Sequence, residues 1–145
     1  MCSGGKDTFV PRFTYHGFRY VSIAGMGGNP PLDAFTALVL GTDAAATAQF
    51  SCSSPLVNRL WANIVWGQRS NFVDVPTDCP QRDERLGWTG DAAVFCRTAA
   101  QNEDVYRFFR KWLADLAIGQ AADGGVPHIV PNVNGQGQRR RCRLV

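Results

Sequence analysis

The chain has 145 residues, of which 45% are hydrophobic and 19% are charged, and its formal net charge is +3. This composition is typical of a globular protein of about one domain and has no signature of intrinsic disorder. A domain of this length can bury about two-thirds of the surface of its unfolded chain, which is enough for a hydrophobic core.

The positive charge is concentrated at the end of the sequence. No acidic residue follows Asp123, and four arginines lie among the last seven residues: Arg139, Arg140, Arg141 and Arg143. An arginine cluster can bind nucleic acid, but no aromatic residue interleaves with this one. We therefore expect no nucleic-acid partner, and a basic-tailed nucleic-acid binder is an alternative that depends on the tail alone.

The five cysteines are scattered and no two have C-x-x-C spacing. This favours reduced, mostly buried thiols over a disulfide framework or a zinc site, and we expect no metal and no cofactor. No run of about eighteen apolar residues is present, so we expect no membrane span. Residues 1–7 lack the hydrophobic part of a signal peptide, which slightly favours the cytoplasm. Nothing in the sequence indicates an oligomeric state.

The first third of the chain is expected to form β-strands. Residues 17–23 alternate in polarity, and residues 34–40 and 47–53 are rich in β-branched or aromatic side chains. A turn-rich connector, residues 25–31, separates the first two segments. Three short strands resemble the end of a sheet domain rather than a complete one, so we expect residues 1–52 to be the end of a β-sandwich domain.

The hydrophobic period then changes from two to that of a helix. Ser54 and Pro55 make a good helix start, and apolar residues follow on one face, which predicts a helix over residues 55–70. The domain boundary is placed at residues 51–54. The polar residues near the end of this helix either line a pocket or form an ordinary polar face: Asn63, Gln68, Arg69 and Asn71.

Residues 72–90 have no periodicity and contain two prolines and two glycines. Such a long loop inside a compact domain is usually functional or disordered, and its Phe72, Leu86 and Trp88 argue against disorder. Two further helices are expected, over residues 91–100 and from Glu103 and Asp104 to Gly119, followed by a loop at 123–132. His16 is expected to be structural, whereas a role for His128 in a site is left open.

The loop and its end gather four carboxylates, two arginines and a tryptophan within DCPQRDERLGWTGD, residues 78–91. Hydrolysis of a glycosidic bond needs one carboxylic acid that protonates the leaving oxygen and a second carboxylate. Asp83 and Glu84 beside Trp88 offer candidates for the acid. Sugars bind through hydrogen bonds to charged side chains and through contact with aromatic rings. A saccharide site is therefore one interpretation, and a salt-bridged structural loop is another.

The segments VPTDCPQRDERLGWTGDA and NRLWANIVWGQRSNFVDVP resemble bacterial α-L-rhamnosidases of glycoside hydrolase family 78. The resemblance also includes PRFTYHGFRYVSIAG, PPLDAFTALVL and DGGVPHIVPNV, so it covers roughly residues 9–134. It implies β-sandwich domains followed by helical hairpins of an (α/α)6 barrel, with residues 53–134 as the N-terminal part of that barrel. It also implies hydrolysis of terminal α-L-rhamnose from rhamnosides with inversion.

By match to the loop, the resemblance implies that Glu84 is the general acid. It implies that Asp78, Arg82, Trp88 and Asp91 form the rhamnose pocket.

The family's general base is a glutamate much further along the barrel, and no acidic residue after Asp91 lies in a matching context. Residues 135–145 no longer resemble the family, and we expect them to be a divergent arginine-rich tail. We therefore expect a fragment of an α-L-rhamnosidase that is inactive alone. The alternative is a non-catalytic carbohydrate-binding or interaction module.

Overall fold

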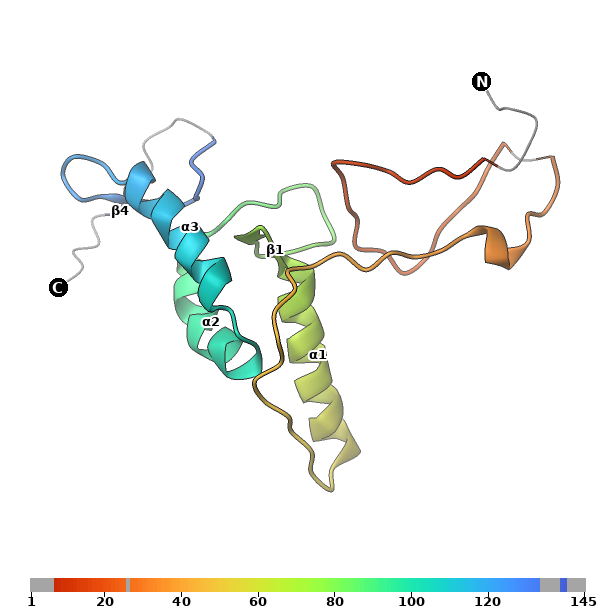
Figure 1. Cartoon of the computed structure of the whole chain (residues 1–145), viewed down its shortest axis with the longest axis horizontal. Helices are drawn as coiled ribbons and strands as arrows, with labels where there is room; N and C mark the ends of the chain where they lie inside the picture. Colours follow the sequence, from red (N-terminus) through yellow and green to blue (C-terminus); the bar gives the residue numbers. More distant parts are fainter. Residues whose placement is uncertain (1–6, 26, 134–138, 141–145) are drawn as a thin grey trace.

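The computed structural model describes residues 7–25, 27–133 and 139–140. Its main elements are three α-helices, which are α1 (Pro55–Asn71), α2 (Thr89–Asn102) and α3 (Tyr106–Gly119). Each of the remaining elements is a single short turn or strand: η1 (Leu32–Ala34), β1 (Phe72–Val73), β2 (Val75–Pro76), β3 (Val126–Pro127) and β4 (Arg139–Arg140). In Figure 1 the N-terminal segment, red to orange, extends to one side of the helices.

The predicted helix over residues 55–70 is confirmed as α1. Pro55 occupies its first turn, where its missing N–H is not needed, and the backbone N–H of Asn58 donates to the carbonyl of Ser54. The predicted side-chain cap is wrong, because the Ser54 hydroxyl makes no capping hydrogen bond. Instead, the Asn58 side chain bonds both the N–H and the carbonyl of Cys52, which fixes the chain as it enters the helix.

The three strands expected over residues 17–23, 34–40 and 47–53 are wrong for this structure. These segments run without a β-ladder, and Tyr20 and Val39 are exposed. β-propensity reports how well a side chain fits a pleated, half-buried surface, and the ladder itself needs a neighbouring strand. Within the described residues no strand pairs with these segments in a β-ladder, so they form no sheet although their side chains alternate in polarity.

The segment before α1 instead lies along the connection between α2 and α3. Thr47 N–H donates to Asn102 O, Asp104 N–H donates to Ala45 O, and Ala46 bridges Glu103. The expectation that Glu103 and Asp104 begin the third helix is also wrong. Glu103 caps the C-terminal end of α2, because its extended backbone cannot continue a helix. The predicted end of α3 at Gly119 is confirmed.

Two aromatic-rich clusters hold the helices together. Phe72 stacks on Phe108 with ring centroids 4.5 Å apart, and this pair packs with Ala99 and Val105. The second cluster joins Ala92 of α2, Trp112 of α3 and Val130 of the loop after β3. Phe109 touches both clusters, so the core runs continuously from the end of α1 to the loop that follows β3.

Between α1 and α2 the chain forms a tight hairpin and then the long loop. β1 and β2 pair antiparallel around Asp74, whose φ of 66° allows the chain to reverse at one residue. The predicted irregular segment is therefore confirmed only after this hairpin, and α2 begins two residues earlier than expected, at Thr89. No helix of the described residues is long and apolar enough to cross a membrane.

Candidate active site

Residues 78–88, here called the acid loop, are fixed at both ends. At the first end Thr77 donates through its N–H and its hydroxyl to the carbonyl of Asn71, at 3.1 and 2.9 Å. At the other end Val130 N–H donates to Gly87 O at 2.8 Å, and Thr77 bridges Gly87 across the base of the loop. The end of α1 and the loop after β3 therefore hold the two stems of the acid loop together.

Gly87 is required by the close approach of its neighbours. A Cβ at this position would lie 2.3 Å from Val130 O and 2.8 Å from Trp112 Nε1. The same carbonyl accepts a hydrogen bond from that indole nitrogen at 3.0 Å. Because backbone and buried indole atoms cannot move aside cheaply, only glycine lets the loop close against α3.

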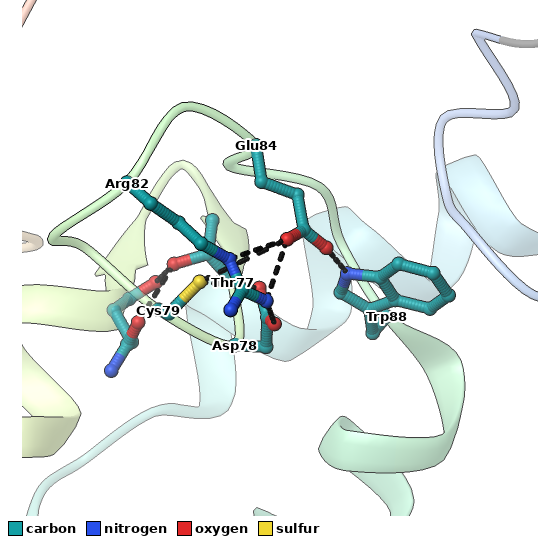
Figure 2. Close-up of polar contacts among 7 residues, drawn as sticks. Thr77, Asp78, Cys79, Arg82, Glu84 and Trp88 are labelled. Atoms are coloured by element: carbon teal, nitrogen blue, oxygen red, sulfur yellow. Dashed lines mark hydrogen bonds and ion pairs between the residues drawn. The ribbon is translucent and has the colours of Figure 1, made fainter.

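Arg82 connects two carboxylates inside the acid loop, as Figure 2 shows. Its NH2 group lies 3.1 Å from Asp78 Oδ2 and 2.8 Å from Glu84 Oε2, and its Nε donates to Glu84 Oε2 at 2.9 Å. Hydrogen bonding to Glu84 raises the pKa of the Arg82 guanidinium further above its ordinary value. Arg82 therefore stays charged and holds the two carboxylates close together.

Glu84 is oriented from its other side by Trp88. The indole Nε1 of Trp88 donates to Glu84 Oε1 at 2.7 Å. Both carboxylate oxygens of Glu84 thus accept hydrogen bonds, one from the indole and the other from Arg82. The side chain of Glu84 is partly buried, with 19% of its surface exposed.

Asp83, the other candidate for the acid, faces elsewhere. Its side chain is 96% exposed and pairs with Arg85 at 3.2 Å. The indole N–H of Trp88 donates to Glu84 and not to Asp83. The geometry therefore favours Glu84 over Asp83 as the candidate acid.

Asp91 lies in the first turn of α2 and shares a cleft of about 590 Å³ with Asp78. The cleft is bounded by α1, by the hairpin and by α2: Ile64, Gly67, Gln68, Asn71, Phe72, Pro76, Thr77, Asp78, Gly90, Asp91, Ala92, Val94 and Phe95. Asp78 thus belongs to both the cleft and the Arg82 cluster. Four of the five predicted site residues form a chain of contacts that runs from Asp78 through Arg82 and Glu84 to Trp88. The fifth, Asp91, lines the same cleft as Asp78.

The polar end of α1 divides between the two roles that its sequence allowed. Gln68 and Asn71 line the cleft, whereas Asn63 is exposed. Gln68 is also buried and donates to Glu103 Oε2 at 3.2 Å, and Arg69 pairs with the same carboxylate. The burial of Gln68 has no signal in the sequence, because its position on a helix does not show which elements cover it.

Neither histidine places its imidazole among the contacts of the acid loop described above. His16 lies 3.1 Å from the hydroxyl of Thr14 and is exposed. His128 contributes its backbone carbonyl, which accepts from the N–H and from the hydroxyl of Thr89 at 2.9 and 3.1 Å. Those bonds fix the first residue of α2, and so the start of the helix that bears Asp91.

Cys79 is a site residue that the sequence interpretation did not select. Its thiol donates to Asp78 Oδ1 at 3.3 Å and lies 4.0 Å from Glu84 Oε2. Burial, together with the hydrogen bond to Asp78, raises the pKa of the thiol above its ordinary value. The sequence offered no local signal for this, because the thiol is defined by neighbours that the fold of the loop brings to it.

The side chains of Asp78, Cys79 and Glu84 also present ligand atoms within 4.8 Å of one another. That spacing would suit a metal ion. The Arg82 guanidinium, however, already pairs with both carboxylates, and a cation would have to displace it. The donor set is therefore better matched to hydrogen bonding than to metal binding.

Two family models match the chain. Residues 45–141 match the bacterial alpha-L-rhamnosidase six-hairpin glycosidase domain, and residues 1–41 match the bacterial alpha-L-rhamnosidase concanavalin-like domain. The two matches are separated by residues 42–44, upstream of the boundary expected at residues 52–53. The match to the six-hairpin domain runs past residue 134. The expected tail, residues 135–145, lies outside the described residues apart from the backbone of β4.

The chain also resembles curated and solved proteins. It is 49% identical over 133 residues to an alpha-L-rhamnosidase of Streptomyces avermitilis and 44% identical over 131 residues to one of Formosa agariphila. These matches cover 92% and 89% of this chain but 13% and 14% of the two relatives. The chain thus spans about an eighth of the length of the relatives that it matches.

Two solved structures have the same fold over most of this chain. The Streptomyces avermitilis alpha-L-rhamnosidase complexed with L-rhamnose matches with a TM-score of 0.83 and 50% identity, covering 88% of this chain and 12% of that one. The alpha-L-rhamnosidase from Dictyoglumus thermophilum matches with a TM-score of 0.82 and 45% identity, covering 86% and 14%. The part of the chain that bears the acid loop is a six-hairpin glycosidase segment. The chain belongs to the bacterial alpha-L-rhamnosidase family.

Proposed function

We propose that this chain supplies the acid side of a site that hydrolyses terminal α-L-rhamnosides with inversion, and that Glu84 is its general acid. The observation that carries the proposal is the Glu84 carboxylate, which Trp88 and Arg82 hold in one orientation next to the cleft that contains Asp78 and Asp91. Family membership makes rhamnose the sugar, since the matched relatives are alpha-L-rhamnosidases.

A general acid must carry a proton before it can give one to the departing oxygen. In the free chain both oxygens of Glu84 accept hydrogen bonds. Protonation of Glu84 weakens the contact at the oxygen that takes the proton, because a hydroxyl oxygen is a poorer acceptor than a carboxylate oxygen. Arg82 is the partner suited to leave, because its side chain is 59% exposed and a sugar hydroxyl can replace the carboxylate as its acceptor. Trp88 then keeps the acid in place.

The remaining residues bind the sugar in this proposal. Asp78 and Asp91 accept hydrogen bonds from rhamnose hydroxyls, since an ionised carboxylate is an acceptor only. The ring of Trp88 packs on an apolar face of the sugar while its N–H stays on Glu84. Arg82 donates to a hydroxyl, as described above.

Inversion needs a second carboxylate that activates water on the opposite face of the sugar. The acidic side chains after Asp91 do not suit this role in the described residues. Glu103 is buried against Arg69 and Gln68, and Asp115 pairs with Lys111 at 3.1 Å. Asp104 and Asp123 each accept a backbone N–H two residues further along the chain. We propose that the base comes from another part of the whole protein, and that the 145 residues alone do not turn over a rhamnoside.

The same proposal assigns residues 1–52 to the end of a β-sandwich domain and residues 53–134 to the first helices of an (α/α)6 barrel. The two family-model matches support a division into these two kinds of domain, and the gap between the matches, residues 42–44, lies further upstream.

The test uses a chimera in which this chain replaces the matching segment of the Streptomyces avermitilis enzyme. Glu84→Gln should lower kcat by about 10²- to 10⁴-fold on a rhamnosyl disaccharide, because the leaving alkoxide then departs without a proton. An activated aryl rhamnoside should lose much less. Asp83→Asn tests the other candidate acid one residue away, and it should lower both rates far less than Glu84→Gln, because the Asp83 side chain is 96% exposed.

Asp78→Asn and Asp91→Asn separate binding from proton transfer. Each removes a charged acceptor of a sugar hydroxyl, worth about 1.5–3 kcal/mol or roughly 10- to 150-fold, and both substrates should suffer alike. If Glu84→Gln lowers both rates by the same factor, Glu84 is not the acid. If the chimera binds rhamnose without turnover while the parent enzyme is active, a binding module is the better description.

A further inference from the structure

The acid loop contacts a segment that lies far from it in the sequence. Arg85 NH2 donates to the carbonyl of Tyr15 at 2.8 Å, and its guanidinium lies over the Tyr15 ring, 4.9 Å from the centroid. Gly17 N–H donates to Pro80 O at 3.2 Å. In Figure 1 the green loop between β1 and α2 extends toward the red N-terminal segment, which carries these residues.

These contacts join two family-model regions. Tyr15 and Gly17 lie within residues 1–41, which match the concanavalin-like domain, and the acid loop lies within residues 45–141, which match the six-hairpin domain. The N-terminal segment therefore touches the loop of the neighbouring domain through Pro80 and Arg85.

The chain geometry transmits this contact to the proposed acid. Arg85 has a φ of 53°, in the left-handed region that a non-glycine residue adopts only at a cost. This conformation sends the Arg85 side chain toward Tyr15 while its neighbour Glu84 contacts Arg82 and Trp88. Since the two residues are adjacent, a shift of Arg85 moves the backbone that carries Glu84.

The approach of the two segments is also close. A Cβ on Gly17 would lie 3.1 Å from Pro80 O and 3.3 Å from Gln81 Cα. Both neighbours are backbone atoms, so the loop itself would have to move by a few tenths of an ångström to admit a methyl group. Gly17 and Tyr15 thus contact the same short loop at two points, one on each side of Glu84 in the sequence.

We infer that Tyr15 and Gly17 are positioning residues for the general acid, supplied by the domain that precedes the barrel. They hold residues 80–85 so that Glu84 keeps its orientation toward Trp88. Neither residue touches the proposed substrate cleft, whose described lining comes from α1, the hairpin and α2. The inference rests on the proposed function of Glu84, and it adds that the preceding domain is part of the catalytic apparatus.

The test places Gly17→Ala and Tyr15→Ala in the chimera described above. Because a misplacement of about 1 Å can cost about 10²-fold, we expect kcat on a rhamnosyl disaccharide to fall by about 10- to 100-fold. KM should change less than kcat, because Asp78 and Asp91 lie outside residues 80–85 and keep their places. The activated aryl rhamnoside should lose less than the disaccharide, since it needs less help from the acid.

Two matched controls accompany these variants. Gly27→Ala adds the same methyl group in the same N-terminal segment, where a Cβ meets nothing within 4 Å, and should behave like the unaltered chimera. Tyr15→Phe keeps both the ring under Arg85 and the backbone carbonyl, so it should restore the rate that Tyr15→Ala loses.

A second readout does not depend on catalysis. Amide hydrogen exchange of peptides from residues 78–88 should become faster in Gly17→Ala and Tyr15→Ala, whereas peptides from α3 should exchange as before. Equal losses on both substrates with unchanged exchange, or wild-type kinetics in both variants, would overturn the inference. If Glu84→Gln is also harmless in an active chimera, the proposed function fails; if only Glu84→Gln is harmful, the positioning role alone fails.

Discussion

Trp88 donates its indole N–H to Oε1 of Glu84, four residues earlier in the chain, at 2.7 Å. This bond closes the acid loop on itself just before α2 begins at Thr89. An isolated β-bridge between Trp88 and Ile129 in turn holds the backbone of Trp88 against the loop after β3. The orientation of the proposed acid therefore depends on the loop that precedes α2 and on the loop that follows β3.

Trp88→Phe should leave the Glu84 carboxylate without the donor that orients it. The variant keeps an aromatic ring for the sugar but removes the donor to Glu84. A hydrogen bond to a charged group contributes about 1.5–3 kcal/mol, so kcat/KM of the chimera should fall roughly 10- to 150-fold. Trp66→Phe is the control, since Trp66 is exposed on α1. Equal activity of the two variants would show that the indole N–H does not orient the acid.

Gly87→Ala should destabilise the chain. Its methyl group would overlap Val130 O at 2.3 Å, and overpacking of this kind costs about 1–3 kcal/mol or more. Gly67→Ala, in the interior of α1 with nothing within 4 Å of its Cβ, should instead stabilise by about 0.5–1 kcal/mol. Urea unfolding at low protein concentration measures both changes. An unaltered midpoint for Gly87→Ala would contradict the close packing of the loop on α3.

The thiols should differ in their reaction with iodoacetamide. The thiolate is the reactive form, and the pKa of Cys79 is raised by burial and by Asp78, so less thiolate is present at any given pH. Cys79 is also buried, whereas Cys52 is exposed. Under native conditions at pH 8, mass spectrometry should find Cys52 alkylated well before Cys79. Asp78→Asn should speed the reaction of Cys79, because it removes the negative charge that opposes ionisation; equal rates for both thiols in the unaltered chain would contradict this account.

The isolated chain should self-associate. Leu56 and Leu60 on α1 are 80% and 57% exposed, and Ile118 on α3 is 84% exposed. Exposed apolar surface of this kind promotes association. Sedimentation velocity should show oligomers that increase with concentration, and Leu56→Glu with Leu60→Glu should reduce them. Arg59→Glu, on the same helix, is the control for the added charge. A monomer at every concentration would rule out the prediction.

The sequence by itself determined the helices and the identity of the loop. The apolar spacing of α1 and α3 follows from a period of 3.6 residues, which local physics sets and which needs no knowledge of the neighbours. The run from Asp78 to Asp91 matched the family because its charged residues, glycines and tryptophan are contiguous. All five proposed site residues lie in this run, so they could be selected before any contact was known.

Tertiary structure alone decided what the N-terminal segments do and how Glu84 is held. The alternation of residues 17–23 could not show whether a partner strand is present, because a ladder belongs to two segments at once. Nor could the sequence show that Tyr15 and Gly17 meet the acid loop. Such contacts between residues far apart in the sequence depend on how the chain folds in space, and a local sequence pattern does not predict them.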